Sequence, residues 1–157
     1  MKPTKISSLI AYVAAVTMVG FVVIQQIVDR GMPAPSAGVS ILIVVPVLAL
    51  YLFVRSYAMI RYRRAMKKFL EEKGKRPSPV DSKYAVSTVV LAKSMSITGS
   101  ILLGWHLSIL WFRLSVSQPT GILPVSLACL ESLALAIVGV IVENLFRVPP
   151  DSDNEAA

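Results

Sequence analysis

Four ionisable side chains interrupt the apolar second half of this sequence, and they are the first candidates for chemistry. Lys93 and His106 lie in one apolar segment, and Glu131 and Glu143 lie in the next. An ionised group in apolar surroundings is costly unless it is paired or hydrogen-bonded. Each of the four is therefore expected to pair with another polar group, to be in its neutral form, or to reach water.

Lys93 and Glu143 are predicted to form an ion pair between two helices. At 100° per residue, Lys93 lies within about 20° of Ser100, and Glu143 lies within about 20° of Ala136. Both charges thus share a face with small residues, which let helices approach closely in lipid. The small residues that we expect to pack the two helices are Ala92, Ser96, Ser100 and Gly104 in the first segment, and Ser132 and Ala136 in the second. The alternatives are that one row contacts another subunit, that Lys93 reaches lipid phosphate, and that Glu143 reaches water.

Glu131 is the candidate intramembrane carboxylate. It lies about a dozen residues into its segment and points away from the Ser132 row by roughly a quarter turn. Such a carboxylate is by default a functional candidate that carries a proton, contacts His106 or meets a charge on another subunit. The alternative is a protonated, hydrogen-bonded acid. His106 itself, beside Trp105 and Trp111, is expected to be an anchor at the membrane interface.

The sequence offers no catalytic, cofactor-binding or metal-binding set. One histidine and one cysteine are too few for a metal site, and Cys129 is expected to be a packing residue. Nucleophile elbows, phosphate loops, HExxH and dinucleotide fingerprints do not occur. We therefore expect a protein that is not an enzyme and needs no cofactor.

The elements that carry these residues are predicted to be four transmembrane helices. Hydrophobic residues make up 55% of the 157 residues and charged residues only 16%, against roughly 25% charged in soluble domains. Four segments reach the roughly 20 apolar residues that a span requires. They are residues 6–28, 39–60, 86–112 and 121–146, within a single all-α membrane domain of residues 1–157.

The distribution of basic residues predicts that both termini are cytoplasmic. Twelve of the 16 lysines and arginines lie before the first span, between the second and third, or after the fourth. The two opposite loops hold only Arg30 and Arg113, and Arg55 and Lys93 lie inside spans. By the positive-inside rule this gives a multi-pass membrane protein with an N-in, C-in topology. Arg55 is expected to extend to the cytoplasmic headgroups, and the alternative is that it joins the cluster of Lys93 and Glu143.

The cytoplasmic segment 61–85 is predicted to begin as a basic extension of the second span. Met59, Tyr62, Met66 and Phe69 with Leu70 recur at helical spacing, and Gly74 and Pro77 would end the helix. Its basic face either binds anionic lipid or only fixes the topology. The candidate lipid contacts are Arg61, Arg63, Arg64, Lys67 and Lys68. Nucleic acid is not an expected partner, because no binding motif accompanies the charge. Residues 148–157 form an acidic tail.

Four segments resemble an uncharacterised family of small actinobacterial membrane proteins, domain of unknown function 3180. The segments are residues 1–6, 88–93, Gly104-Trp105 and 142–150. The resemblance implies a plasma-membrane protein but supplies no activity. It favours Lys93, Glu143 and Arg147 over Glu131 as important residues, and it weakens a role for His106.

The sequence favours a non-enzymatic accessory or scaffold subunit of an envelope complex, with a membrane-protein partner or a second copy of itself. The runner-up is a small oligomeric transporter or proton-coupled carrier that uses Glu131 or the Lys93–Glu143 pair. An enzyme acting on lipid headgroups is the weakest option, because the cytoplasmic segment lacks convergent acids or histidines.

Overall fold

Four long helices make up the described part of the chain. A computed structural model describes residues 4–72, 81–117 and 120–146. Within them α1 runs over Ile6–Asp29, α2 over Val39–Glu72, α3 over Ser82–Ser115 and α4 over Ile122–Leu145, and no strand occurs. Each helix contains a stretch long and apolar enough to cross a membrane. The predicted all-α, four-span fold is therefore confirmed, while the orientation of the termini stays a prediction.

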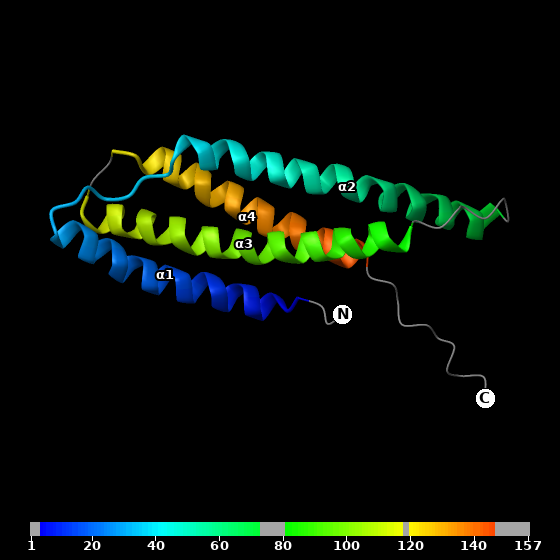
Figure 1. The fold of residues 1–157 in the computed structure, drawn as a ribbon, viewed down its shortest axis with the longest axis horizontal. Coiled ribbons are helices and arrows are strands. Elements are labelled where there is room, and N and C mark those ends of the chain that lie inside the picture. Colours follow the sequence, from blue (N-terminus) through cyan, green and yellow to red (C-terminus); the bar gives the residue numbers. More distant parts are fainter. Residues whose placement is uncertain (1–3, 73–80, 118–119, 147–157) are drawn as a thin grey trace, which may run out of the picture.

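Helix α2 is longer than a bilayer requires. Its 34 residues correspond to roughly 50 Å at 1.5 Å per residue, against about 30 Å of hydrocarbon. The extra length is residues 61–72, which the sequence predicted to be helical. Figure 1 shows this part of α2 continuing in line with the rest of the helix and extending past the ends of the other three. Gly74, Pro77 and the acidic tail 148–157 lie outside the described residues.

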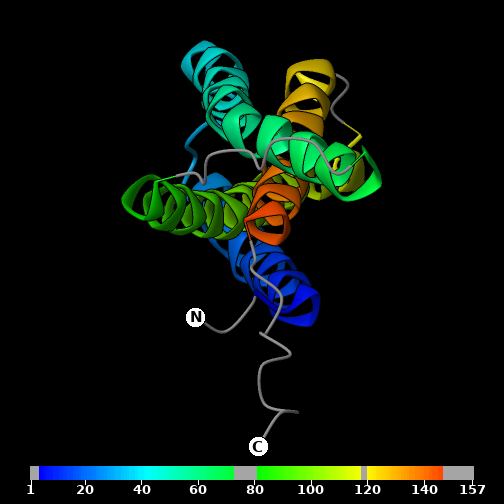
Figure 2. The same cartoon turned by 90° about the vertical axis from the view of Figure 1, so that its right-hand side faces the viewer.

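The helices are packed in the order α1, α3, α4, α2. Among the described helices, α1 packs only against α3, whereas α2 packs mainly against α4 and slightly against α3. Figures 1 and 2 show α3 and α4 in the middle, with α1 and α2 on opposite sides of them. The most apolar stretches of α3 and α4 are 33% and 44% buried, against 11% and 17% for α1 and α2. The two flanking helices therefore expose most of their apolar surface.

Two glycines allow the backbones of α3 and α4 to touch. A Cβ atom on Gly99 would lie 2.6 Å from the backbone nitrogen of Ala136, and one on Gly139 would lie 2.7 Å from that of Ser96. The predicted packing residues Ala92, Ser96, Ser100, Ser132 and Ala136 are all buried. Gly104 lies elsewhere, because its Cβ position is 2.7 Å from the carbonyl oxygen of Val13 on α1. It packs α3 against α1 and not against α4.

The end of the bundle that holds residues 30–38, 116–117 and 120–121, here named the loop end, is held together by Arg113. Its guanidinium donates from Nη2 to the carbonyl oxygen of Pro35 at 3.0 Å and from Nη1 to that of Thr120. Arg113 is buried. Gly121, with φ +82°, leaves room for it, since a Cβ there would lie 2.6 Å from Nη1. One side chain thus fastens both loops.

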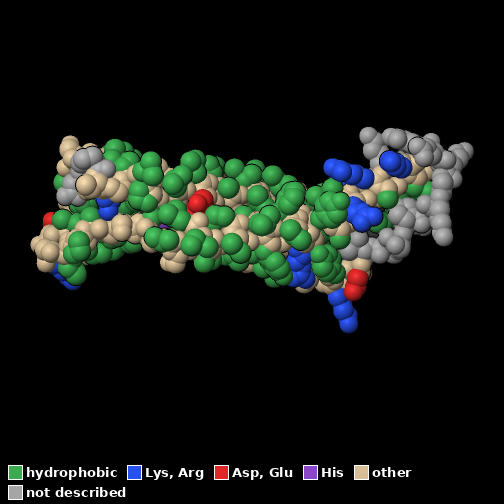
Figure 3. Space-filling model, turned by 90° about the horizontal axis from the view of Figure 1, so that it is seen from above, with side chains coloured by type: hydrophobic (Ala, Val, Ile, Leu, Met, Phe, Trp, Pro, Cys, Tyr) green, Lys and Arg blue, Asp and Glu red, His purple; other side chains and the backbone are tan. Residues whose placement is uncertain are grey.

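The opposite end, which holds Thr4, Phe146 and the extension of α2, is here named the basic end. Figure 3 shows hydrophobic side chains over the middle of one face and Lys and Arg side chains toward the ends. A band of apolar surface between charged ends is the pattern expected of a membrane-embedded bundle.

Candidate functional site

Glu143 is buried at the basic end, where it joins α4 to the beginning of α1. Its Oε1 accepts a hydrogen bond from the backbone N–H of Thr4 at 2.8 Å, whereas Oε2 has no hydrogen-bond partner. The N-cap residue of α1, Lys5, makes no side-chain cap. A carboxylate at this position compensates the positive end of the helix dipole. Glu143 therefore stabilises the N-terminus of α1, a role that the sequence did not reveal.

Lys93 lies half-buried on α3, in the stretch where α3 meets α4. Its neighbour Ala92 has its carbonyl oxygen 2.8 Å from the Cβ position of Gly139, one turn before Glu143. The structure thus places Lys93 and Glu143 on the two most closely packed helices, in the same half of the molecule. The ion pair between them stays a prediction.

Glu131 lies half-buried in the middle of α4, with its buried Oε2 lacking a hydrogen-bond partner. It is within about 20° of Val142 on the helix, and Val142 packs in one cluster with residues of both α2 and α3. Glu131 therefore lies on the side of α4 that borders this cluster. Figure 3 shows acidic atoms surrounded by hydrophobic side chains in the middle of the molecule.

His106 is fully buried against α4, which corrects the expectation of an interfacial anchor. Its Nδ1 lies 3.3 Å from Ser132 Oγ, and that hydroxyl donates to the carbonyl oxygen of Ala128 at 2.6 Å. Because the hydroxyl hydrogen is used there, the contact fits the tautomer that carries its proton on Nδ1. Nε2 has no hydrogen-bond partner, and no hydrogen bond joins His106 to Glu131 among the described residues.

Arg55 makes more contacts than the sequence suggested. Its Nη1 donates to Tyr51 Oη at 3.2 Å and its Nη2 donates to Ser87 Oγ at 2.8 Å. The guanidinium carbon lies 4.9 Å from the centre of the Tyr84 ring, and Tyr84 Oη donates to the Arg55 carbonyl oxygen at 2.7 Å. Arg55 thus joins α2 to α3. The i, i+4 spacing of Tyr51 and Arg55 was the available signal in the sequence.

The basic extension of α2 presents its charges to solvent. Arg61, Arg63, Arg64 and Lys68 are exposed, whereas Tyr62, Met66 and Phe69 are half-buried. The side chain of Lys67 lies outside the described residues. The two faces of this helix therefore differ in the way that the amphipathic pattern predicts.

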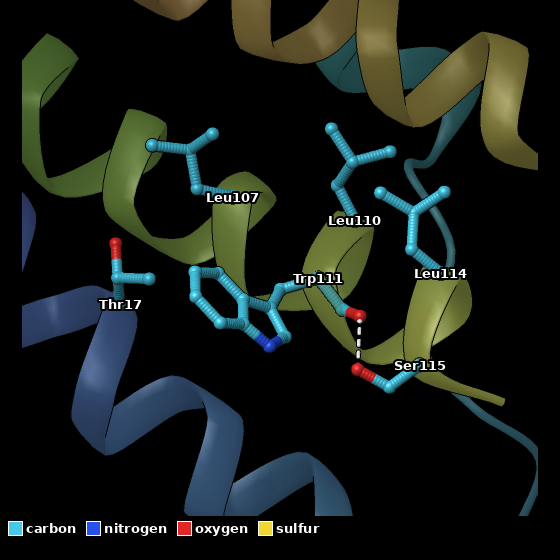
Figure 4. A pocket seen from close by; sticks show the side chains of 6 residues that line it. All are labelled: Thr17, Leu107, Leu110, Trp111, Leu114 and Ser115. Atoms are coloured by element: carbon cyan, nitrogen blue, oxygen red, sulfur yellow. Dashed lines mark hydrogen bonds between the residues drawn. The ribbon is translucent and has the colours of Figure 1, made fainter.

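A hollow of about 520 Å³ lies between α1 and α3 toward the loop end. Figure 4 shows its lining, where the Trp111 indole lies between the two helices. The lining residues are Thr17, Leu107, Leu110, Trp111, Leu114 and Ser115. The Thr17 hydroxyl donates to the Val13 carbonyl oxygen, and the Ser115 hydroxyl donates to that of Trp111. The hollow is therefore lined mainly by apolar side chains, and both hydroxyl groups in its lining are already hydrogen-bonded.

In the part of the chain that the structure describes, no three His, Cys, Asp or Glu side chains lie close enough together to bind a metal ion.

A family model described as "Protein of unknown function (DUF3180)" matches residues 9–150. No curated protein and no solved structure is significantly similar to the chain.

Proposed function

The chain belongs to the DUF3180 family of proteins of unknown function, and we propose that it is a non-enzymatic accessory or scaffold subunit of a larger complex in the bacterial plasma membrane. The observation that carries this proposal is the extension of α2. Residues 61–72 form a basic helix in line with the span and beyond the ends of the other helices. A helix that leaves the membrane in this way is an arm for contact with a partner.

The direction of the arm favours a protein partner over a membrane surface. Twelve residues of helix extend over roughly 18 Å, whereas the attraction of a charged lipid surface falls off within about 10 Å at 0.1 M salt. Arg61 lies near the beginning of the arm and is well placed for anionic lipid. Lys68, two turns further along, is better placed for acidic groups on another protein.

Inside the membrane, α1 and α2 supply surface for the same partner or for a second copy of the chain. Each flanking helix is covered mainly by one neighbour, and large apolar residues such as Met18, Val22 and Phe53 are exposed. Lipid covers such faces by default, and a partner helix replaces lipid where packing and hydrogen bonds favour it.

Purification from native membranes in mild detergent, with mass spectrometry of the copurifying proteins, tests the proposal. The arm variant Arg61→Gln/Arg64→Gln/Lys68→Gln keeps most of the topological charge bias, so it still inserts in the same direction. Its control is Lys5→Gln/Lys83→Gln, which removes two exposed charges at the same end but off the arm.

We expect a stoichiometric partner with the native chain and with the control, and about tenfold less of it with the arm variant, which is a loss of about 1.4 kcal/mol in binding. A native chain that purifies alone, or an arm variant that keeps its partner, contradicts the accessory role.

The second candidate is a proton-coupled carrier, which one observation favours. Glu131 Oε2 and His106 Nε2 are buried polar atoms without hydrogen-bond partners inside predicted spans, and such groups mark proton pathways in many transporters. The test is proton or solute flux in liposomes with Glu131→Gln, compared at equal incorporation with Asp81→Asn at an exposed helix terminus. Flux that is lost only in Glu131→Gln supports the carrier, and flux equal to that of empty liposomes rejects it.

A further inference from the structure

Arg55 carries a charge that no carboxylate compensates among the described residues. Its two terminal nitrogens donate to neutral hydroxyl groups, those of Tyr51 and Ser87. Its Nε is buried and has no hydrogen-bond partner. A half-buried guanidinium in this situation favours the approach of an anion, because the attraction is screened less than in water.

The neighbours of Arg55 hold the guanidinium in one orientation. The Tyr84 ring covers one face at 4.9 Å, and the Tyr84 hydroxyl is fixed on the Arg55 carbonyl oxygen. Ser87 Oγ uses its own hydrogen on the Tyr84 carbonyl oxygen at 3.0 Å, so it accepts from Arg55. The result is a pre-oriented group, which loses less conformational entropy on binding than a free arginine would.

The donors that remain match a phosphate. A guanidinium has five N–H groups, and after the bonds to Tyr51 and Ser87 each terminal nitrogen keeps one. Two parallel N–H groups bind two oxygens of one phosphate. The Tyr51 hydroxyl accepts from Nη1, and its own hydrogen is not used by any described residue. It can therefore donate to the same anion.

The position of Arg55 along the helices selects the source of the phosphate. It lies six residues before Arg61, which is about 9 Å inside the first charge of the arm. Ser87 lies six residues after Asp81, at a similar depth on α3. The predicted span ends at residue 60, so Arg55 lies about 8 Å inside the boundary between hydrocarbon and headgroups, and an arginine at such a depth draws headgroups and water toward itself by local thinning of the bilayer. The exposed arginines of the arm add a positive potential next to it.

We propose that Arg55 and Tyr51 form a binding site for a phosphate group, supplied by the headgroup of an anionic phospholipid, and that Ser87 holds the Arg55 guanidinium in position. The site is distinct from the arm, because it holds one headgroup by directed hydrogen bonds, whereas the arm attracts a charged surface without fixed geometry. It also stands whether or not the accessory role is correct.

Lipid binding to the purified full-length protein tests the site. The bound lipids are counted by native mass spectrometry during titration with phosphatidylglycerol or phosphatidylcholine, in 1 M salt, where the Debye length is about 3 Å. Under these conditions we expect one tightly bound phosphatidylglycerol per chain. Arg55→Lys keeps the charge but loses the paired donors, so it weakens that binding by about tenfold. The matched variant Arg61→Gln, which acts through diffuse attraction, binds like the native chain.

Tyr51→Phe is the second variant, since it leaves the guanidinium and its contacts with Ser87 and Tyr84 in place. We expect severalfold weaker binding at an unchanged melting temperature. Native affinity in both Arg55→Lys and Tyr51→Phe overturns the site, and if Arg55→Lys does not fold, Tyr51→Phe alone decides. Inorganic phosphate is the competitor that identifies the source. Displacement of the lipid by millimolar phosphate overturns the headgroup assignment, and retention of the lipid supports it.

Discussion

Five of the described ionisable residues in or next to the predicted spans each keep one buried polar atom without a hydrogen-bond partner, and they differ in what their other polar atoms do. Arg55, Arg113 and Glu143 also make hydrogen bonds to neighbouring elements, and His106 contacts a serine of α4 through Nδ1. Glu131 leaves its buried Oε2 without a partner. An unsatisfied buried group costs about 1–3 kcal/mol. The hydrogen-bonded atoms therefore explain how the helices are held together, and the unsatisfied atoms are where a proton, a ligand or another subunit would act.

Arg113→Ala is predicted to lower the free energy of unfolding by about 2–3 kcal/mol, because hydrogen bonds from a charged donor contribute about 1.5–3 kcal/mol. The substitution leaves the carbonyl oxygens of Pro35 and Thr120 without their donor. Denaturant titration in detergent micelles, followed by circular dichroism, measures the change. Arg30→Ala is the control, since substitution of this exposed arginine is expected to change the free energy of unfolding by no more than about 0.5 kcal/mol. Equal stability of the two variants would show that Arg113 does not fasten the loops.

The Lys93–Glu143 pair is tested by a double-mutant cycle. Glu143→Gln removes the charge but keeps an oxygen for the Thr4 N–H, and Lys93→Met removes the opposite charge. If the two groups are paired, the double variant is more stable than the sum of the single losses predicts, by about 1 kcal/mol. The same cycle with Glu131→Gln and Lys93→Met is the control and is expected to be additive. Additive losses at Glu143 would reject the pair.

At the scale of the helices, the contact between α3 and α4 follows steps of three and four residues. A strict four-residue step turns the helix by about 40° each time, so Gly104 lies about 120° around α3 from Ala92. It consequently faces Val16 of α1. Gly99, seven residues after Ala92, turns back by only about 20° and faces α4. Alternating steps of three and four residues keep one side of α3 in contact with α4, as in a coiled coil.

Gly99→Ala and Gly139→Ala are each predicted to destabilise the bundle by about 1–3 kcal/mol, because an added methyl group would overlap backbone atoms of the facing helix. The distances from the two Cβ positions to the nearest backbone nitrogen are 2.6 Å and 2.7 Å. Gly38→Ala is the control, since its nearest neighbour is Ser40 Oγ at 3.5 Å, an ordinary contact. Unfolding of the three variants under the same conditions compares them directly. Control-like stability at Gly99 would mean that the two helices are less tightly packed.

The sequence predicts the helices better than it predicts their contacts. Hydropathy places the first span at residues 6–28, and the helix is Ile6–Asp29. Hydropathy places the spans correctly because the burial of an apolar helix in lipid depends on its composition and length alone. The hydrogen bond between Glu143 and Thr4 and the contact between His106 and Ser132 depend on the order in which the helices pack. One sequence read along its chain does not contain that order, and the contacts of Arg55 with Tyr84 and Ser87 of α3 were not predicted for the same reason.

The whole molecule is an open row of helices with unequal ends. The order α1, α3, α4, α2 leaves the flanking helices covered mainly on one side. At the loop end Arg113 fastens short connections, whereas at the basic end α2 extends beyond the others (Figure 1). Contacts with lipid and with a partner are therefore concentrated along the flanks and at one end. Which side of the membrane that end faces decides whether the arm meets the cytoplasm.

The positive-inside rule predicts that the basic end is cytoplasmic, since twelve of the 16 lysines and arginines belong to its side. Single cysteines in a Cys129→Ala background, probed with an impermeant maleimide, test this, and buried Cys129 has no exposed role to lose. We expect Arg30→Cys to be labelled in intact cells, and Lys5→Cys and Lys68→Cys only after permeabilisation. All three positions are exposed, so access to the reagent and not burial decides the result. Labelling of Lys68→Cys in intact cells would put the arm outside, where it could meet neither a cytoplasmic partner nor the anionic inner leaflet.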